Sequence, residues 1–214
     1  MRPFRLGVLV SGEGSNLQAV LDSLHGREGI EVACVGASRP DAPALARARG
    51  AGVPTGVFAA GDHPDRAVRD EALAEFLTAH GVDLVVLAGF TELLAPAFVR
   101  RFDGRMINVH PSLLPAFPGL RSIEQALDYG VRVTGVTVHF VDEGVDTGPI
   151  VAQEAIELPY AADIARVEES VHAVEHRVLP EAIRLIAAGK VQIEAAEPGA
   201  RRRVTIEGER RGER

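Results

Sequence analysis

Four short apolar runs, separated by stretches with helical periodicity, constrain the fold of this chain most strongly. The runs cover residues 6–10, 32–37, 84–88 and 106–109, and each is rich in Val, Leu or Ile. Runs of this length and composition are typical of strands buried on both faces of a parallel sheet. The intervening patterns predict helices over residues 16–24, 42–51, 63–80 and 95–102. Strands that alternate with helices predict an α/β fold with a mostly parallel, twisted sheet.

The pattern changes after Pro111. Residues 119–129 predict a loop and then a helix, residues 133–140 and 149–156 predict strands, and residues 164–186 predict a long amphipathic helix. Pro180 lies inside this last helix, where a proline removes a backbone hydrogen bond. We therefore expect Pro180 to kink the helix or to start a new segment.

The domain organisation that we predict is one domain over residues 1–190, followed by a C-terminal strand and a charged, mobile tail over residues 191–214. The last part of the chain is rich in Arg and Glu and poor in apolar residues. Such a composition favours a frayed end, with a short strand or hairpin around residues 204–206.

Charge and hydropathy exclude several classes of protein. The formal net charge of -7 argues against a nucleic-acid-binding surface, because the phosphate backbone attracts a basic face. No run approaches the roughly 20 apolar residues of a membrane span, and Arg5 interrupts the first run too early for a signal peptide. The lone cysteine, Cys34, is predicted to be a buried hydrophobic residue that forms no intrachain disulfide. We expect a cytoplasmic protein that binds neither nucleic acid nor membrane, as a monomer or a homodimer.

A glycine-containing loop follows the first predicted strand and leads into a helix. Its sequence is SGEGSN, residues 11–16, in which Gly12 and Gly14 allow a close approach of the backbone to a ligand and Ser15 is a candidate helix cap. Free amides at a helix N-terminus attract an anion such as a phosphate. The spacing matches neither the dinucleotide fingerprint nor the P-loop, so the alternatives are a mononucleotide-like phosphate site and a plain strand-to-helix turn.

A second set of polar residues lies at the end of the strand that begins at Met106. Alternation along a strand places Asn108 and His110 on the same face, at the sheet edge where open α/β sheets bind ligands. An amide donor beside an imidazole suits an oxyanion that forms at a carbonyl carbon.

Asp146 lies in a turn-rich loop, residues 141–149, and a carboxylate there can favour the charged form of a nearby imidazole or move a proton. A turn aspartate without chemistry is the alternative. His139 is ambiguous, and we interpret it as a packed or supporting residue. The chain carries no nucleophile elbow and no metal-binding motif, so we expect no metal and a direct attack by a substrate amine.

The chain resembles the folate-dependent glycinamide ribonucleotide formyltransferase family over roughly residues 5–190. The matching strings are VSGEGSNLQA (10–19), VLAGF (86–90), NVHPSLLP (108–115), FPGL (117–120), GVTVHF (135–140) and DTGPI (146–150). The resemblance implies a Rossmann-like formyltransferase fold, with helices on both faces of the sheet and two ligands that meet at its C-terminal edge. The implied reaction moves a formyl group from 10-formyltetrahydrofolate, the co-substrate, to the amine of glycinamide ribonucleotide in de novo purine synthesis.

The family pattern also implies site residues. Gly14, Ser15 and Asn16 are expected to hold the ribonucleotide phosphate, and Glu175 to contact the glycinamide end. Asn108, His110 and Asp146 are expected to form the catalytic group, in which His110 donates a proton and Asp146 raises the pKa of His110. The expected folate-binding residues are Arg66, Thr91, Glu92, Leu93, Leu94, Asn108, Val141, Asp142, Glu143, Gly144 and Val145.

Four positions depart from the family pattern. Glu13 stands where asparagine is common and is expected to point away from the phosphate, and Glu92 stands where a basic or polar residue is familiar. Ala116 replaces a usual lysine, and Arg121, which replaces a histidine, is a candidate to supply charge instead.

Three alternatives remain at this point. A formyltetrahydrofolate hydrolase would use the same Asn, His and Asp with water as acceptor, together with an N-terminal regulatory domain. A methionyl-tRNA formyltransferase would need a further C-terminal domain and a basic face. A nucleotide- or folate-binding module without turnover is the alternative from another class.

Overall fold

A computed structural model describes residues 2–160, 163–195 and 200–208. Its main sheet has seven strands in the order β3-β2-β1-β4-β5-β6-β7. The strands are β1 (Phe4–Val10), β2 (Ile30–Ala37), β3 (Thr55–Val57), β4 (Leu84–Leu87), β5 (Met106–His110), β6 (Val133–Phe140) and β7 (Ile150–Glu157). Neighbours from β3 to β5 are parallel, whereas β6 pairs antiparallel with both β5 and β7. The mostly parallel sheet confirms the predicted fold class.

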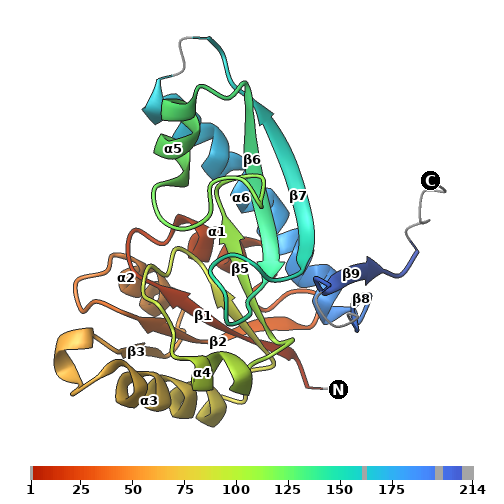
Figure 1. Cartoon of the computed structure of the whole chain (residues 1–214). Helices are drawn as coiled ribbons and strands as arrows, with labels where there is room; N and C mark the ends of the chain where they lie inside the picture. The colour runs from red at the N-terminus through yellow and green to blue at the C-terminus, as the bar shows by residue number, and fades with distance from the viewer. Residues whose placement is uncertain (1, 161–162, 196–199, 209–214) are drawn as a thin grey trace.

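The helices cover both faces of this sheet (Figure 1). They are α1 (Ser15–Leu24), α2 (Ala44–Gly50), α3 (Arg66–Ala79), α4 (Pro96–Arg101), α5 (Ser122–Tyr129) and α6 (Ile164–Ala187), with a short 3-10 turn, η1 (Ala60–Asp62). Alternation in β1 sends Val8 and Val10 into the core beneath α1, α2 and α6. Leu9, between them, enters the second core, beneath α3 and α4. Because the strands are apolar on both sides, each face of the sheet buries its own helical layer.

Two expectations about local structure need correction. The sequence pattern missed β3, because this strand has only three residues and lies between Pro54 and Phe58 without an apolar run. α6 continues through Pro180 from Ile164 to Ala187, so of the two expected outcomes a new segment is excluded and a kink at Pro180 stays a prediction. Pro180 is buried on α6, and the packing of the apolar stripe around it stabilises the helix despite the missing amide hydrogen.

A two-stranded antiparallel sheet follows α6 and is formed by β8 (Val191–Glu194) and β9 (Arg203–Ile206). Its apolar residues Val191, Ile193 and Val204 pack against the larger core. Arg202 forms an ion pair with Asp103 at 2.9 Å, which ties this sheet to the loop before β5. The tail that was predicted to be mobile lies outside the described residues from position 209 onward, so its mobility stays a prediction.

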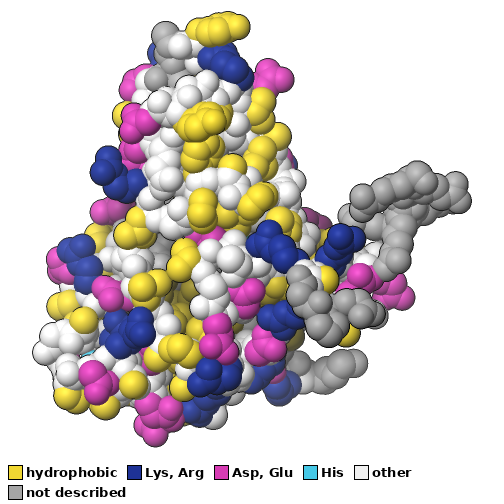
Figure 2. All heavy atoms as spheres, in the orientation of Figure 1, with side chains coloured by type: hydrophobic (Ala, Val, Ile, Leu, Met, Phe, Trp, Pro, Cys, Tyr) yellow, Lys and Arg dark blue, Asp and Glu magenta, His cyan; other side chains and the backbone are white. Residues whose placement is uncertain are grey.

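The surface is mixed in charge. On the face drawn in Figure 2, basic and acidic side chains are interspersed. Within residues 2–160, 163–195 and 200–208, no helix is long and apolar enough to cross a membrane.

Candidate active site

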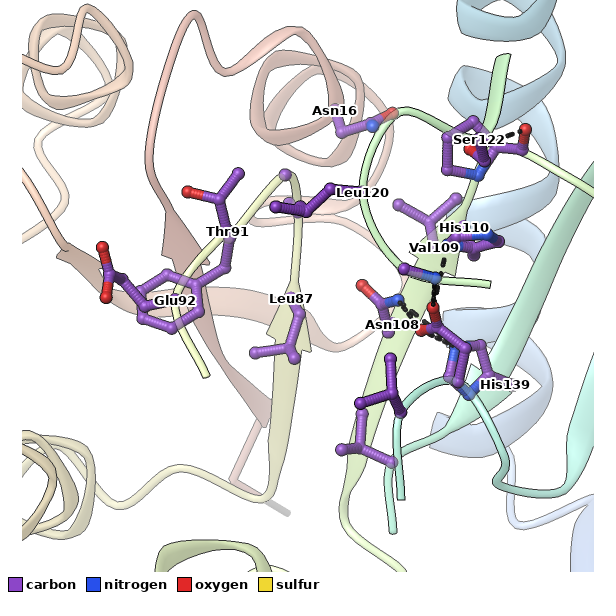
Figure 3. Close-up of a pocket in the computed structure, with 18 of the residues that line it drawn as sticks. Asn16, Leu87, Thr91, Glu92, Asn108, Val109, His110, Leu120, Ser122 and His139 are labelled. Atoms are coloured by element: carbon purple, nitrogen blue, oxygen red, sulfur yellow. Dashed lines mark hydrogen bonds and ion pairs between the residues drawn. The ribbon is translucent and has the colours of Figure 1, made fainter. Parts of the chain in front are cut away.

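A cavity of about 810 Å³ opens at the carboxyl ends of β1, β4 and β5. Its walls come from five segments, residues 12–16, 87–94, 108–111, 119–124 and 141–146, together with Val99, His139, His172 and Glu175. Leu87 and Thr91 lie on one side of this cavity, and Asn108, His110 and His139 lie on the other (Figure 3). The position is the one that open α/β sheets use for ligands, because the loops after parallel strands converge there.

The first wall is the turn between β1 and α1. Gly14 has a φ of 74° and precedes the first residue of α1, and no side chain caps that helix, so the predicted capping role of Ser15 was wrong. The first amides of an α-helix have no partner within the helix, so those of α1 are available to an anion at the cavity. Glu13 is exposed and lies among the lining residues, and the expectation that its side chain points away from the phosphate stays a prediction.

Asn16 and Glu175 form a buried acceptor pair at the back of the cavity. The Asn16 Nδ2 donates to Glu175 Oε2 at 3.0 Å, although the two residues are 159 positions apart. Burial raises the pKa of the Glu175 carboxyl, against the opposing influences of Asn16 and His172. The Asn16 Oδ1 is buried and has no hydrogen-bond partner among the residues that the structure describes. This corner therefore offers oxygen acceptors to a ligand that brings N–H or O–H donors.

Asp146 joins the residues that were predicted to be catalytic. Its Oδ2 accepts a hydrogen bond from the Gly119 amide at 2.7 Å and lies 3.4 Å from His110 Nδ1. Its Oδ1 lies 3.4 Å from Asn108 Nδ2 and 3.5 Å from His139 Nε2. Asp146 has a φ of 52°, a left-handed conformation that aspartate tolerates better than most residues. The turn thus holds one carboxylate against two imidazoles and one amide.

The protonation of His110 follows from its partners. Its Nε2 lies 2.9 Å from the Phe117 carbonyl, which can only accept, so this nitrogen carries a hydrogen and Nδ1 faces Asp146. Burial lowers the pKa of His110 below its ordinary value of 6.5, and the nearby Asp146 opposes the shift without overcoming it. Asp146 thus acts on the His110 pKa in the expected direction, whereas burial has the larger effect and makes the net shift downward.

The carboxylate itself is kept ionised. Burial pushes the pKa of Asp146 upward, but the neighbouring imidazole of His139, the Gly119 amide and the imidazole of His110 together bring the pKa below its usual value. A carboxylate with a lowered pKa holds an acquired proton only weakly, which suits a group that passes protons on.

His139 is buried on β6, as its strand position indicated, and its supporting role stays a prediction. Its Nδ1 lies 2.8 Å from the Phe140 carbonyl, which places the hydrogen on Nδ1 and leaves Nε2 facing Asn108 at 3.2 Å. Asn108 Nδ2 therefore directs its hydrogens to His139 and Asp146, as the dashed lines in Figure 3 mark. Both contacts exceed 3 Å, so one hydrogen can turn to a ligand in the cavity.

The residues predicted to bind folate divide into two groups. Those of the segments 91–94 and 141–145 all line the cavity. Leu93 and Val145 there are 63% and 54% exposed, so the cavity has an exposed apolar wall that a flat ring can cover. Arg66, the first residue of α3, is exposed and is not among the lining residues. Its role stays a prediction.

Sequence reasoning missed His172 as a cavity residue. It lies on α6 three positions before Glu175, so that both side chains face the cavity from one side of the helix. The spacing His-x-x-Glu was the available signal. Arg121 also lines the cavity, with a φ of 59°, as the substitution in the family pattern suggested. Within the described ranges of the chain, no group of three or more His, Cys, Asp or Glu side chains is arranged to hold a metal.

Comparison with known proteins places this chain in a family. Residues 4–183 match the formyl transferase family. The chain therefore belongs to the formyl transferase family of enzymes.

Within that family, the chain is 43% identical over 204 residues to the phosphoribosylglycinamide formyltransferase of Mycobacterium tuberculosis, covering 95% of this chain and 94% of that protein. The crystal structure of glycinamide ribonucleotide transformylase 1 from Symbiobacterium toebii superposes with a TM-score of 0.89 at 48% identity, covering 96% of this chain and 94% of that one. The trifunctional purine biosynthetic protein adenosine-3 of Bos taurus is 42% identical over 190 residues, but the chain spans only 19% of its length.

The lowered pKa of His110 predicts a dependence of stability on pH. The unfolded histidine binds a proton near pH 6.5 and the folded one only below that, so the free energy of unfolding falls as the pH drops from 7 through this window. The partly buried His176, whose pKa is also lowered, acts in the same direction, whereas Glu175, whose pKa is raised, acts in the opposite one. We therefore expect His110→Gln to lose less stability than the wild type between pH 7 and pH 5, measured by urea unfolding. An equal loss of unfolding free energy in the two proteins would show that the fold does not lower the pKa of His110.

Proposed function

We propose that this chain transfers the formyl group of 10-formyltetrahydrofolate to the amine of glycinamide ribonucleotide, giving formylglycinamide ribonucleotide and tetrahydrofolate in purine synthesis. The observation that carries the proposal is the meeting of Asn108, His110 and Asp146 in one cavity. The anion-binding end of α1 and the apolar wall at Leu93 lie on the same cavity. The site thus offers separate places for a phosphate and for a flat ring, with polar groups between them.

In the mechanism that we propose, the primary amine attacks the formyl carbon, and the developing oxyanion accepts hydrogen bonds from Asn108 and from His110 in its protonated, charged form. Asp146 takes up the proton that the amine loses, and His110 delivers a proton to N10 as the carbon–nitrogen bond of the donor breaks. The bound phosphate and the oxyanion are negative, so the filled cavity favours the charged imidazole more than the empty one does. Holding both ligands in line supplies much of the remaining acceleration.

The acceptor corner supports a glycinamide ribonucleotide. The Asn16 Oδ1 and the Glu175 carboxylate suit the N–H and hydroxyl groups of that substrate, because they are acceptors. A phosphate needs hydrogen-bond donors, but the side-chain amide of Asn16 already donates to Glu175. Gly14, Ser15 and Asn16 would therefore bind the phosphate through their backbone N–H groups. No metal enters the proposal, and the expected location remains the cytoplasm.

A replacement of Glu175 tests this corner. Glu175→Gln is expected to raise the KM for the ribonucleotide by about tenfold, the scale of losing a hydrogen bond to a charged group. The KM for the formyl donor should not change. Tm should stay or rise, since a buried carboxylate with a raised pKa is costly to the fold. A lower Tm with an unchanged ribonucleotide KM would instead make Glu175 a purely structural residue.

The function itself is tested by following the absorbance of the folate product from 10-formyltetrahydrofolate, with and without glycinamide ribonucleotide. We expect product release only when the ribonucleotide is present. Release without the ribonucleotide would establish a hydrolase, and donor binding without any release would establish a binding module. Either outcome would overturn the proposal.

A further inference from the structure

A buried ion pair on α3 lies directly behind one wall of the cavity. Arg69 and Asp70 are neighbours in the chain, and their side chains are only 3% and 2% exposed. The Arg69 Nε donates to Asp70 Oδ1 at 2.8 Å. Burying two charges is costly even when they are paired, and such a pair is often no more stabilising than apolar residues of similar size. Stability of the fold alone is therefore a weak reason for this pair.

The remaining polar atoms of the pair bind a single segment, residues 92–95. The Arg69 Nη1 donates to Glu92 Oε2 at 3.0 Å, and Nη2 donates to the Leu93 carbonyl at 2.9 Å. Asp70 Oδ2 accepts the amide hydrogen of Ala95 at 2.5 Å, at the residue that precedes α4. Two side chains of α3 thus hold a side chain, a carbonyl and an amide of the same short stretch.

This stretch has no regular structure to hold it. Residues 88–95 lie between β4 and α4 and belong to neither a strand nor a helix. At its start, the Thr91 amide donates to Ser11 Oγ at 3.0 Å. Ser11 therefore anchors one end, Asp70 anchors the other, and Arg69 holds the middle. A segment without regular backbone hydrogen bonds takes its position from such side-chain contacts. The side chains of α3 therefore set the position of Thr91–Leu94 in the cavity wall.

The same contacts explain an acidic residue beside the apolar wall. Glu92 stands at a cavity position where the family pattern led us to expect a basic or polar residue, and its side chain is 39% exposed. Figure 3 shows its carboxylate on the side turned away from Asn108 and His110. The guanidinium of Arg69 compensates the charge of Glu92 from behind, so the wall that faces the cavity keeps its apolar character at Leu93 and Leu94.

We propose that Arg69 and Asp70 are positioning residues for the formyl donor: they fix the segment Thr91–Leu94 and neutralise Glu92, and so shape the wall against which the donor binds. This inference rests on the proposed function for the identity of the ligand. It does not make either residue catalytic, because neither lines the cavity.

The test compares Arg69→Met with Arg69→Lys in the full chain. Arg69→Met is expected to raise the KM for 10-formyltetrahydrofolate by about tenfold, the scale of losing charged hydrogen bonds. The kcat and the ribonucleotide KM should stay within about threefold of the wild type, since the reacting groups are untouched. Arg69→Lys keeps the charge but cannot make all these bonds, so its donor KM should fall between those of the wild type and Arg69→Met. An equal increase in both KM values, or a lower kcat with both KM values unchanged, would overturn the proposal.

A second variant covers the case in which Arg69→Met does not fold. Glu92→Ala removes a partly exposed side chain and should raise the donor KM by about threefold. If Glu92 acts through Arg69, the double variant Arg69→Lys, Glu92→Ala should cost no more than the larger single change. Additive losses would mean that Glu92 contacts the donor directly, and would contradict the proposal.

Two readouts separate this inference from the proposed function. Hydrogen exchange at the amides of residues 91–95 should be faster in Arg69→Lys than in the wild type, whatever reaction the chain performs. Calorimetric titration with tetrahydrofolate should show the same weakening of binding as the donor KM. If the wild type transfers no formyl group, the proposed function fails while these two measurements still decide the inference. An unchanged rate of amide hydrogen exchange at residues 91–95 in Arg69→Lys would contradict the inference even in an active enzyme.

Discussion

Replacing Asp146 with Asn is expected to lower kcat by about 100-fold or more, which is the scale of losing an acid–base partner. The carboxylate is the group that His110, His139, Asn108 and the Gly119 amide all face, and an amide in its place cannot take a proton from the attacking amine. The KM values should change much less, because Asp146 contributes to the reaction more than to ground-state binding. Steady-state kinetics with each substrate varied in turn measures both effects.

The control and the partner variant make this result specific. Asp128→Asn removes an exposed carboxylate from α5, away from the cavity, and should leave kcat unchanged. His110→Gln should lower kcat as strongly as Asp146→Asn, and the double variant should be little worse than either, because residues that act as a unit are not additive. Near-normal turnover in Asp146→Asn would remove Asp146 from the mechanism.

Replacing Gly14 with Ala is expected to raise the ribonucleotide KM by about tenfold and to lower the free energy of unfolding by about 1–3 kcal/mol. The φ of 74° at Gly14 disfavours any side chain, and a Cβ there would lie 2.5 Å from Ala44 Cβ and 2.9 Å from Ala44 Cα. The turn must therefore shift, and the amides at the start of α1 shift with it. Enzyme kinetics and urea unfolding measure the two consequences.

Gly26 provides a matched control for Gly14. Its φ is 71°, but a Cβ there meets nothing within 4 Å. Gly26→Ala should therefore show a backbone cost in unfolding without a change in the ribonucleotide KM, because Gly26 does not line the cavity. Equal changes in KM for Gly14→Ala and Gly26→Ala would mean that the turn before α1 holds no phosphate.

The sheet could be predicted from the sequence because strands buried on both faces are apolar throughout. Leu84–Leu87, with all four residues buried, shows the pattern at its simplest. β3 escaped prediction because a three-residue edge strand of Thr, Gly and Val has neither the length nor the apolar content of a buried run. Pro180 left two outcomes open because local backbone chemistry does not show the apolar contacts that keep α6 continuous.

The candidate site, like the fold, could be predicted from the sequence only in part. Alternation along β5 was enough to predict that Asn108 and His110 share a face, and both line the cavity. The raising effect of Asp146 on the His110 pKa could be predicted, but the larger lowering effect of burial could not, since burial depends on the surrounding fold and not on the neighbouring sequence. The contact between Asn16 and Glu175 spans 159 positions, and the contact between Arg69 and Glu92 spans 23. Pairings of this kind depend on how α1, α3 and α6 pack on the sheet, which no local pattern encodes.

The measurement that tests the central claim most directly follows the formyl carbon. The enzyme is incubated with 10-formyltetrahydrofolate carrying ¹³C in its formyl group and with glycinamide ribonucleotide, and the products are read by NMR. We predict that the label appears as a formamide on the glycinamide nitrogen, in equal amount to the tetrahydrofolate released, and that Asp146→Asn slows its appearance by about 100-fold. Label recovered as free formate, or retained on the folate while the ribonucleotide is unchanged, would contradict the account.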